Sequence, residues 1–565
     1  MALLDLDPDV VATARRLAAL AAEPVVDIAR AHTTVAVERA TLRLAGITGA
    51  DTGHRAGDVP WVNRVVDTVR EQCGLEHGVV TPAFHALREH DLATLTDLAE
   101  ATAAGQIRYR VPTGADARRA AKAGRTAVAR GLRTVDRNRA QRDRLVARHG
   151  DPAQRPWIYL IVATGDIDED VVQAANAARA GADVIAVIRS TGQSLLDYVP
   201  EGATHHGFAG TYATQENFRI MRAAMDEVSK EVGRYIRVTN YASGLCMPEI
   251  AVLAGLQRLD MMLNDSMYGI LFRDINPIRT FVDQRFSRQV HARAGIIINT
   301  GEDNYLTTAD AVEAAHTVTV SQLLNEHFAH EAGLPDELLG LGHAFEINPE
   351  VPESFRLELA HALLARELFP DAPLKWMPPT KHMTGDVWKG YLLDGFFNLA
   401  GLLTGQSILL VGMMTEAVVT PFLSDRDLAL GNVRYVLNAA AGLREDFRPA
   451  PGGLIVKRAH QVLDEAVDLL DRIVRDGLLP AIADGTFGLM KRPPDAGKGA
   501  DGVIEKADGY LNPASDLLEG AGAPERSASG LMSARRRASA EHAKREDAGS
   551  AQGRERPENT EGATK

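Results

Sequence analysis

Short apolar runs alternate with longer amphipathic stretches through the middle of the chain, from about residue 157 to residue 410. The runs are rich in branched residues, which favours buried strands, and most are followed by a segment with helical spacing of its apolar positions. This alternation predicts parallel strands covered by helices, and eight such units predict an α/β fold of the (β/α)₈ TIM-barrel type. An open, doubly wound sheet is the main alternative. The runs begin at residues 157, 183, 235, 259, 295, 339, 373 and 407, and the sixth is weak because it is glycine-rich.

The residues before the barrel region, 1–150, predict a helical N-terminal accessory region. Apolar positions recur with helical spacing over Val10–Ala21 and Phe84–Ala101. The stretch Ala115–His149 is rich in Ala and Arg and has few large apolar residues, so we expect an exposed helix or a helical linker there.

The barrel itself is expected at 151–420, and a helical C-terminal extension at 421–517, where Val456–Val474 is the clearest helix. Residues 518–565 are dominated by Ser, Gly, Pro and charged residues, with almost nothing that could build a core. This composition predicts a disordered C-terminal tail.

Composition narrows the possible functions. The chain has 565 residues, 45% of them hydrophobic and 24% charged, as expected of a soluble globular protein. A formal charge of −13 argues against broad nucleic-acid binding, and no apolar run approaches the roughly 18 residues of a membrane helix. Cys73 and Cys246 lie far apart, and the N-terminus lacks the charged-then-apolar order of a signal peptide, so we expect a reducing cytoplasm.

Several common site motifs do not occur. The chain has no Walker loop, no strand-linked G-x-G-x-x-G and no H-E-x-x-H. His205 and His206 are adjacent and would lie on opposite faces of a strand, which makes them poor shared ligands. We therefore expect no metal site.

Polar residues gather where the predicted strands end, which is where TIM barrels place their active sites. Arg189 ends the second run, and Arg273 follows the fourth; two arginines indicate a bound anion, to which Ser194 and Ser243 can add hydroxyl donors. Tyr268 offers a flat face on which an aromatic cofactor could stack. Polar loops are common on any surface, so it is the repetition at several strand ends that favours a site.

Lys375 stands out because it lies in an apolar run between Leu374 and Trp376. Desolvation would lower its pKa and make it a candidate Schiff-base amine. Alternatively, it pairs with Asp303 and binds a substrate carboxylate or a cofactor oxygen, or it forms an ordinary strand-end salt bridge.

From about His32 to Pro513 the chain resembles the α subunit of lysine 5,6-aminomutase, an adenosylcobalamin- and pyridoxal phosphate-dependent family. The matches are long and contiguous, and they begin with HTTVAVERATLRLAGI near the N-terminus. The densest are IYLIVATGDI, ADVIAVIRSTGQSLLDYVP, GTYATQENFRIMR, SGLCMPEIA, YGILFRDIN, AGIIINTGEDNYLTTADA, GLGHAFE, APLKWMPPTKHMTG and FGLMKRPPDAGKGADGV.

The resemblance implies a barrel whose mouth holds pyridoxal phosphate. It also implies a radical shift of the terminal amino group of D-lysine or L-β-lysine to the adjacent carbon, which converts D-lysine to 2,5-diaminohexanoate. Asp303, Lys375 and Tyr268 match the positions of the catalytic machinery. Cofactor-binding positions match Arg189, Ser194, Ser243, Tyr268 and Arg273.

The resemblance further implies a small β subunit that carries both the cobalamin-binding domain and the Schiff-base lysine, in an α2β2 assembly. The cobalamin signature Asp-x-His-x-x-Gly does not occur in these 565 residues, which agrees with an α subunit and makes Lys375 a substrate- or cofactor-contacting cation instead. An ornithine 4,5-aminomutase-like isomerase is the nearest alternative, although its large subunit carries its own cobalamin domain. A pyridoxal phosphate-binding homologue that acts as a scaffold without turnover is another.

Overall fold

The computed structural model describes residues 3–52, 58–151, 156–189, 193–241, 244–265, 267–300, 312–342, 348–378, 382–415 and 421–519, with the backbone alone at 188, 189 and 241. Residues Met1–Ala521 form one compact unit. Most of the tail predicted to be disordered, 518–565, lies outside the described residues.

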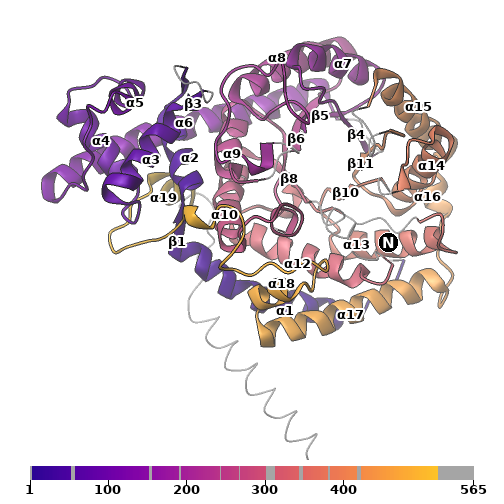
Figure 1. The fold of residues 1–565 in the computed structure, drawn as a ribbon. Coiled ribbons are helices and arrows are strands. Elements are labelled where there is room, and N and C mark those ends of the chain that lie inside the picture. Colours follow the sequence, from indigo (N-terminus) through magenta and orange to yellow (C-terminus); the bar gives the residue numbers. More distant parts are fainter. Residues whose placement is uncertain are drawn as a thin grey trace, which may run out of the picture. The chain divides into compact units, whose positions relative to one another are not determined.

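Parallel strands surrounded by helices form the centre of this unit (Figure 1). They make one 8-stranded sheet in the order β10-β11-β4-β5-β6-β7-β8-β9. A parallel bridge between Gly342 and Lys375, with the Lys375 amide donating to the Leu341 carbonyl at 3.0 Å, links the two edges. The predicted TIM-type barrel is therefore confirmed, and the open sheet is excluded. The strands are β4 (Trp157–Ile161), β5 (Val184–Arg189), β6 (Arg237–Tyr241), β7 (Met261–Leu263), β8 (Ile297–Asn299), β9 (Leu339–Gly340), β10 (Lys375–Trp376) and β11 (Ile408–Leu410).

Each strand is followed by a helix on the outside of the barrel, which explains why the strands are apolar on both faces. Polar caps define where several of these helices begin: Asp166 accepts from the amides of Asp168 and Glu169, and Thr214 accepts from that of Asn217. The outer helices are α7 (Ile167–Arg179), α8 (Gln215–Val232), α9 (Met247–Leu256), α10 (Pro277–Ala294), α12 (Ala315–Glu331), α13 (Ser354–Leu368), α14 (Val387–Thr404) and α15 (Leu423–Ala439).

The N-terminal region is mostly helical, as predicted, but the single helix expected over Phe84–Ala101 is wrong. The chain turns at Asp91, which has a left-handed φ of 52°, and a capping box between Thr94 and Asp97 starts a second helix. The elements are α1 (Pro8–Ala31), β1 (His32–Thr34), α2 (Val35–Ala45), β2 (Ala50–Asp51), β3 (Val59–Pro60), α3 (Trp61–Cys73), α4 (Val80–Glu89), α5 (Leu95–Ala103) and α6 (Gly114–His149).

Helix α6 covers the Ala- and Arg-rich stretch, but one of its faces is buried, which corrects the expectation of an exposed helix or linker. Small residues make this possible. A Cβ at Gly131 would lie 2.1 Å from the Leu44 carbonyl oxygen of α2, and one at Gly124 would lie 2.2 Å from Val80 of α4. The small side chains therefore allow close helix–helix contact in place of a large apolar stripe.

The C-terminal extension returns to the N-terminal elements. Helix α17 packs along α1, α12 and α13 (Figure 1), and β12 pairs antiparallel with β1. The boundaries expected at 150 and 420 stay predictions. In the part of the chain described here, no helix combines the length and apolarity needed to cross a membrane. The elements are α16 (Leu443–Asp446), α17 (Leu454–Asp476), α18 (Leu478–Asp484), β12 (Val503–Glu505) and α19 (Pro513–Glu519).

Candidate functional site at the barrel mouth

The structure describes four of the seven predicted site residues in full: Ser194, Tyr268, Arg273 and Lys375. The backbone of Arg189 ends β5 beside Tyr241 of β6, as predicted, but its side chain lies outside the described residues. Ser243 and Asp303 lie outside them altogether, so their roles stay predictions.

Ser194 lies in a 3₁₀ turn, Gln193–Leu195, just beyond the end of β5, and both Gln193 and Ser194 are buried. The Gln193 side chain holds this turn by donating to the Ala213 carbonyl at 3.0 Å and accepting from the Ala213 amide at 2.6 Å. On the other side, the Ser194 carbonyl accepts from the amide of Leu245, beyond β6, at 3.1 Å. The turn is thus fixed to the loops that follow two strands, as an anion site made from several strand ends requires.

Tyr268 begins a π-helical turn, Tyr268–Phe272, that follows β7, and Arg273 comes directly after this turn. Such turns are rare and often occur at functional sites. Arg273 donates to the Tyr268 hydroxyl at 2.9 Å, and its guanidinium lies 5.5 Å from the Tyr268 ring and 4.6 Å from the Phe272 ring. The two rings lie 5.3 Å apart at 30°. Arg273 therefore fixes the orientation of a buried tyrosine.

Lys375 is fully buried and faces the barrel interior. The next residue, Trp376, donates from its indole to Glu358 of α13 at 2.7 Å and so faces the helical layer. Because successive strand residues point to opposite faces, Lys375 points inward. Lys375 is therefore an interior residue, and its pairing with Asp303 or in another salt bridge stays a prediction.

A layer of buried polar side chains lies in the same interior. Tyr159 is fully buried, and the Asn299 amide donates to the Thr239 hydroxyl at 3.5 Å. With Lys375, these residues come from β4, β6, β8 and β10, the alternate-strand pattern by which TIM barrels build their interior layers. Burial raises the pKa of Tyr159, so its hydroxyl stays neutral.

Comparison with known proteins gives this site its context. A family model described as the D-lysine 5,6-aminomutase TIM-barrel domain of the alpha subunit matches residues 4–517. The chain belongs to this family. The lysine 5,6-aminomutase alpha subunit of Acetoanaerobium sticklandii is 50% identical over 515 residues, which cover 91% of this chain and 98% of that relative. The alpha subunit of Fusobacterium nucleatum is 50% identical over 520 residues, covering 92% and 99%.

A more distant relative bears on the alternative function. The D-ornithine 4,5-aminomutase subunit beta of Acetoanaerobium sticklandii is 27% identical over 376 residues, which cover 64% of this chain and 50% of that protein. The resemblance to lysine 5,6-aminomutase is thus confirmed, and the chain is an aminomutase α subunit, part of an isomerase.

In this aminomutase chain, Tyr159 and Thr239 are interior polar residues that were not among the candidates predicted from the sequence. The two residues lie in the runs WIYLIVA and YIRVTN, which predict apolar strands. The available signal was a polar side chain at an interior position of a strand buried on both faces. The same strands also carry outward-facing polar groups, so the signal alone is ambiguous.

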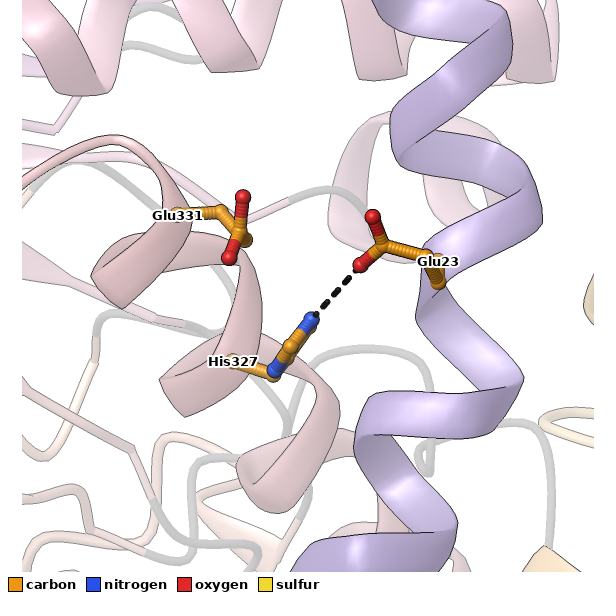
Figure 2. Close-up of side chains that lie close together, drawn as sticks. All are labelled: Glu23, His327 and Glu331. Carbon is orange, nitrogen blue, oxygen red and sulfur yellow. Dashed lines mark ion pairs between the residues drawn. The ribbon is translucent and has the colours of Figure 1, made fainter. Parts of the chain in front are cut away.

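Two groups of described residues could bring a histidine and two carboxylates to one cation. One joins Glu23 of α1 to His327 and Glu331 of α12, with 3.6 Å between His327 Nε2 and Glu23 (Figure 2). Arg30 donates to both carboxylates, at 3.3 Å and 2.6 Å, so the group works as an ion-pair contact between two helices. In the other group, His205 lies 3.7 Å and 3.8 Å from two exposed carboxylates, those of Asp166 and Asp168.

Proposed function

We propose that this chain is the catalytic α subunit of a lysine 5,6-aminomutase that depends on adenosylcobalamin and pyridoxal phosphate. The observation that carries the proposal is 50% identity over nearly the whole length of two lysine 5,6-aminomutase α subunits. The reaction moves the terminal amino group of D-lysine, or of L-β-lysine, to the adjacent carbon, and it converts D-lysine to 2,5-diaminohexanoate.

The residues at the barrel mouth fit pyridoxal phosphate. Buried amide groups with no hydrogen-bond partner among the described residues lie at two strand ends: both polar atoms of Asn240 and the oxygen of Asn299. Unpaired buried polar atoms are uncommon in native proteins and suit a site that receives a polar ligand. A fixed serine turn and a buried tyrosine held by arginine match the needs of a phosphate and a flat ring.

In this proposal, Ser194, together with Arg189 and Ser243, binds the phosphate. Tyr268 sets the plane of the pyridine ring, and Arg273 holds Tyr268 in place. Pyridoxal phosphate supplies an electron-accepting ring and a carbonyl group for the substrate amine, and adenosylcobalamin supplies the radical initiator.

In this proposal Lys375, which is buried in the barrel interior, contacts the substrate. Together with Asp303 it selects a substrate that carries both charges, and it presents its ammonium group in a site from which water is excluded.

A small β subunit completes the proposed enzyme. It binds most of the cobalamin and provides the Schiff-base lysine, and we propose an α2β2 assembly in the cytoplasm. The naming of the relatives as alpha subunits and the free thiols of Cys73 and Cys246 support this arrangement.

Co-expression with a small subunit tests the proposal. The purified complex, given both cofactors and D-lysine, should form 2,5-diaminohexanoate, and the chain without the small subunit should not. L-β-lysine and D-ornithine are tested in parallel. Turnover of D-ornithine alone would favour the ornithine enzyme, and pyridoxal phosphate binding without turnover of any substrate would favour the scaffold.

A further inference from the structure

Helix α2 carries two arginines that are buried in contact with the barrel. Arg39 donates from Nε to one carboxylate oxygen of Glu249 on α9, and Arg43 donates from Nε to the other oxygen, both at 2.7 Å. All three side chains are almost completely inaccessible to solvent. This helix belongs to the segment HTTVAVERATLRLAGI, which the proposed function leaves without a role.

The same arginines reach the loop that continues from the Ser194 turn. Arg39 also donates to the Asp197 carboxylate, and Arg43 donates to Glu201 at 2.9 Å. Asp197 follows Ser194 by three residues, so an accessory helix holds the chain directly beside the proposed phosphate site.

Arg279 of α10 connects this loop to the next strand end. It donates to Asp197 at 3.0 Å and to the Leu245 carbonyl at 2.7 Å, and the Leu245 amide donates to the Ser194 carbonyl at 3.1 Å. These three hydrogen bonds, together with the backbone from Ser194 to Asp197, therefore form a closed ring through both loops. Moving Asp197 would move both sides of the Ser194 turn.

The charge of Asp197 is maintained by its surroundings. Burial alone would raise the pKa of its carboxyl group, but the charges of Arg39 and Arg279 outweigh that effect and lower the pKa to about 2. Asp197 is therefore ionised at every pH at which the enzyme could work. The Asp197 side chain is 38% exposed, whereas Arg39 and Arg279 are buried. Packing alone would not require two buried arginines at this position, because apolar residues of similar volume can stabilise a buried contact equally well.

We propose that Asp197 is a positioning residue, which with Arg39 and Arg279 fixes the Ser194 turn and so sets the affinity for the cofactor phosphate. The inference rests on the proposed function, in which Ser194 binds pyridoxal phosphate. It gives the N-terminal helix α2 a role in cofactor binding, although α2 lies outside the barrel.

The test uses the full chain co-purified with its small subunit. Asp197→Asn keeps the size of the side chain but removes the charge, and it should weaken pyridoxal phosphate binding about ten-fold or more, since displacements near 1 Å have effects of that order. The dissociation constant is measured by cofactor absorbance, with inorganic phosphate as a competitor. Asp197→Glu should restore affinity in part, because it retains the carboxylate.

Asp226→Asn is the matched control. Asp226 on α8 also pairs with two buried arginines: it forms an ion pair with Arg222 at 3.0 Å and accepts a hydrogen bond from Arg258. Among the described residues, neither arginine is bonded to the Ser194 turn. It should lower thermal stability without weakening cofactor binding. Arg39→Lys provides a second variant if Asp197→Asn does not fold, and it should weaken binding because one ammonium group cannot reproduce both contacts of the guanidinium.

The outcomes distinguish a failure of the inference about Asp197 from a failure of the proposed function. Equal cofactor affinity in Asp197→Asn and the unmodified complex would overturn the inference, as would equal losses in Asp197→Asn and Asp226→Asn. An unmodified complex that binds no pyridoxal phosphate would instead overturn the proposed function.

Discussion

Gly244 offers the sharpest test of the geometry at the barrel mouth. An alanine Cβ at this position would lie 2.2 Å from the Ser194 carbonyl oxygen and 2.5 Å from the Ser194 Cα. Both atoms belong to the backbone, so no side chain can rotate away. An ordinary contact near 3.4 Å requires the two segments to separate by about 1 Å.

This separation should have two measurable effects. Overpacking should lower stability by about 1–3 kcal/mol. The shift of the Ser194 turn should weaken pyridoxal phosphate binding by about 10- to 100-fold, because a 1 Å misplacement of a positioning group has effects of that size. Cofactor titration of the complex measures the second effect, and thermal unfolding without cofactor measures the first.

Gly431→Ala serves as the control. Gly431 lies in α15, where an added Cβ would meet nothing within 4 Å. This change should raise stability by up to about 1 kcal/mol, through helix propensity, and leave the cofactor affinity unchanged. If Gly244→Ala binds pyridoxal phosphate as tightly as the unmodified chain, Ser194 does not contribute to the phosphate site as we propose.

Three further predictions concern single side chains. Lys375→Met should lower kcat for D-lysine by about 100-fold or more while cofactor affinity changes little, because a buried charge is lost from the substrate side. Equal losses of kcat and of pyridoxal phosphate affinity, the latter measured by titration with the cofactor, would contradict this role. Tyr268→Phe removes the 2.9 Å contact with Arg273 and should weaken cofactor binding by a few-fold, whereas Tyr268→Ala should weaken it ten-fold or more. Identical cofactor affinities of these two variants would argue against stacking of the ring on the cofactor. Burial raises the pKa of Asp170 to about 6. The stability that the protonated Asp170 contributes is therefore present below about pH 4 and is lost as the pH rises through 6, a change of about 3 kcal/mol in the free energy of unfolding. Asp170→Asn should flatten the pH dependence of Tm between pH 4 and 7, and an unchanged slope would refute this assignment.

The barrel was predictable because each strand is apolar on both faces and each is followed by a helical period. Even the glycine-rich sixth run forms a strand, β9, since Gly340 allows close approach: a Cβ there would lie 2.5 Å from the Ile298 carbonyl oxygen. The break in the helix predicted over Phe84–Ala101 was harder to see, because apolar spacing continues across it. Only the capping pattern of Thr94 and Asp97 marks the new start.

The site was only partly predictable from residue pattern. Strand-end position identified Ser194, Tyr268, Arg273 and Lys375 as candidates, but the pattern could not say which side chains contact each other. That Arg273 holds the Tyr268 hydroxyl depends on a π-helical turn, which has no periodic signature in the sequence. That Lys375 points inward could be established only once its neighbour Trp376 was seen to face α13.

Buried ion pairs connect the accessory helix α2 to the barrel. Glu249 on α9 is fully buried, and its only cationic partners among the described residues are Arg39 and Arg43 of α2. Without α2, this buried carboxyl group would lose both of these partners, and breaking a buried ion pair by removing one side costs several kcal/mol. Many TIM barrels are complete without added segments, but here α2 provides two of the arginines that pair with carboxylates in the wall beside the proposed cofactor site. The long match HTTVAVERATLRLAGI therefore reflects a requirement of the barrel itself, and changes in α2 should be felt first at the Ser194 turn.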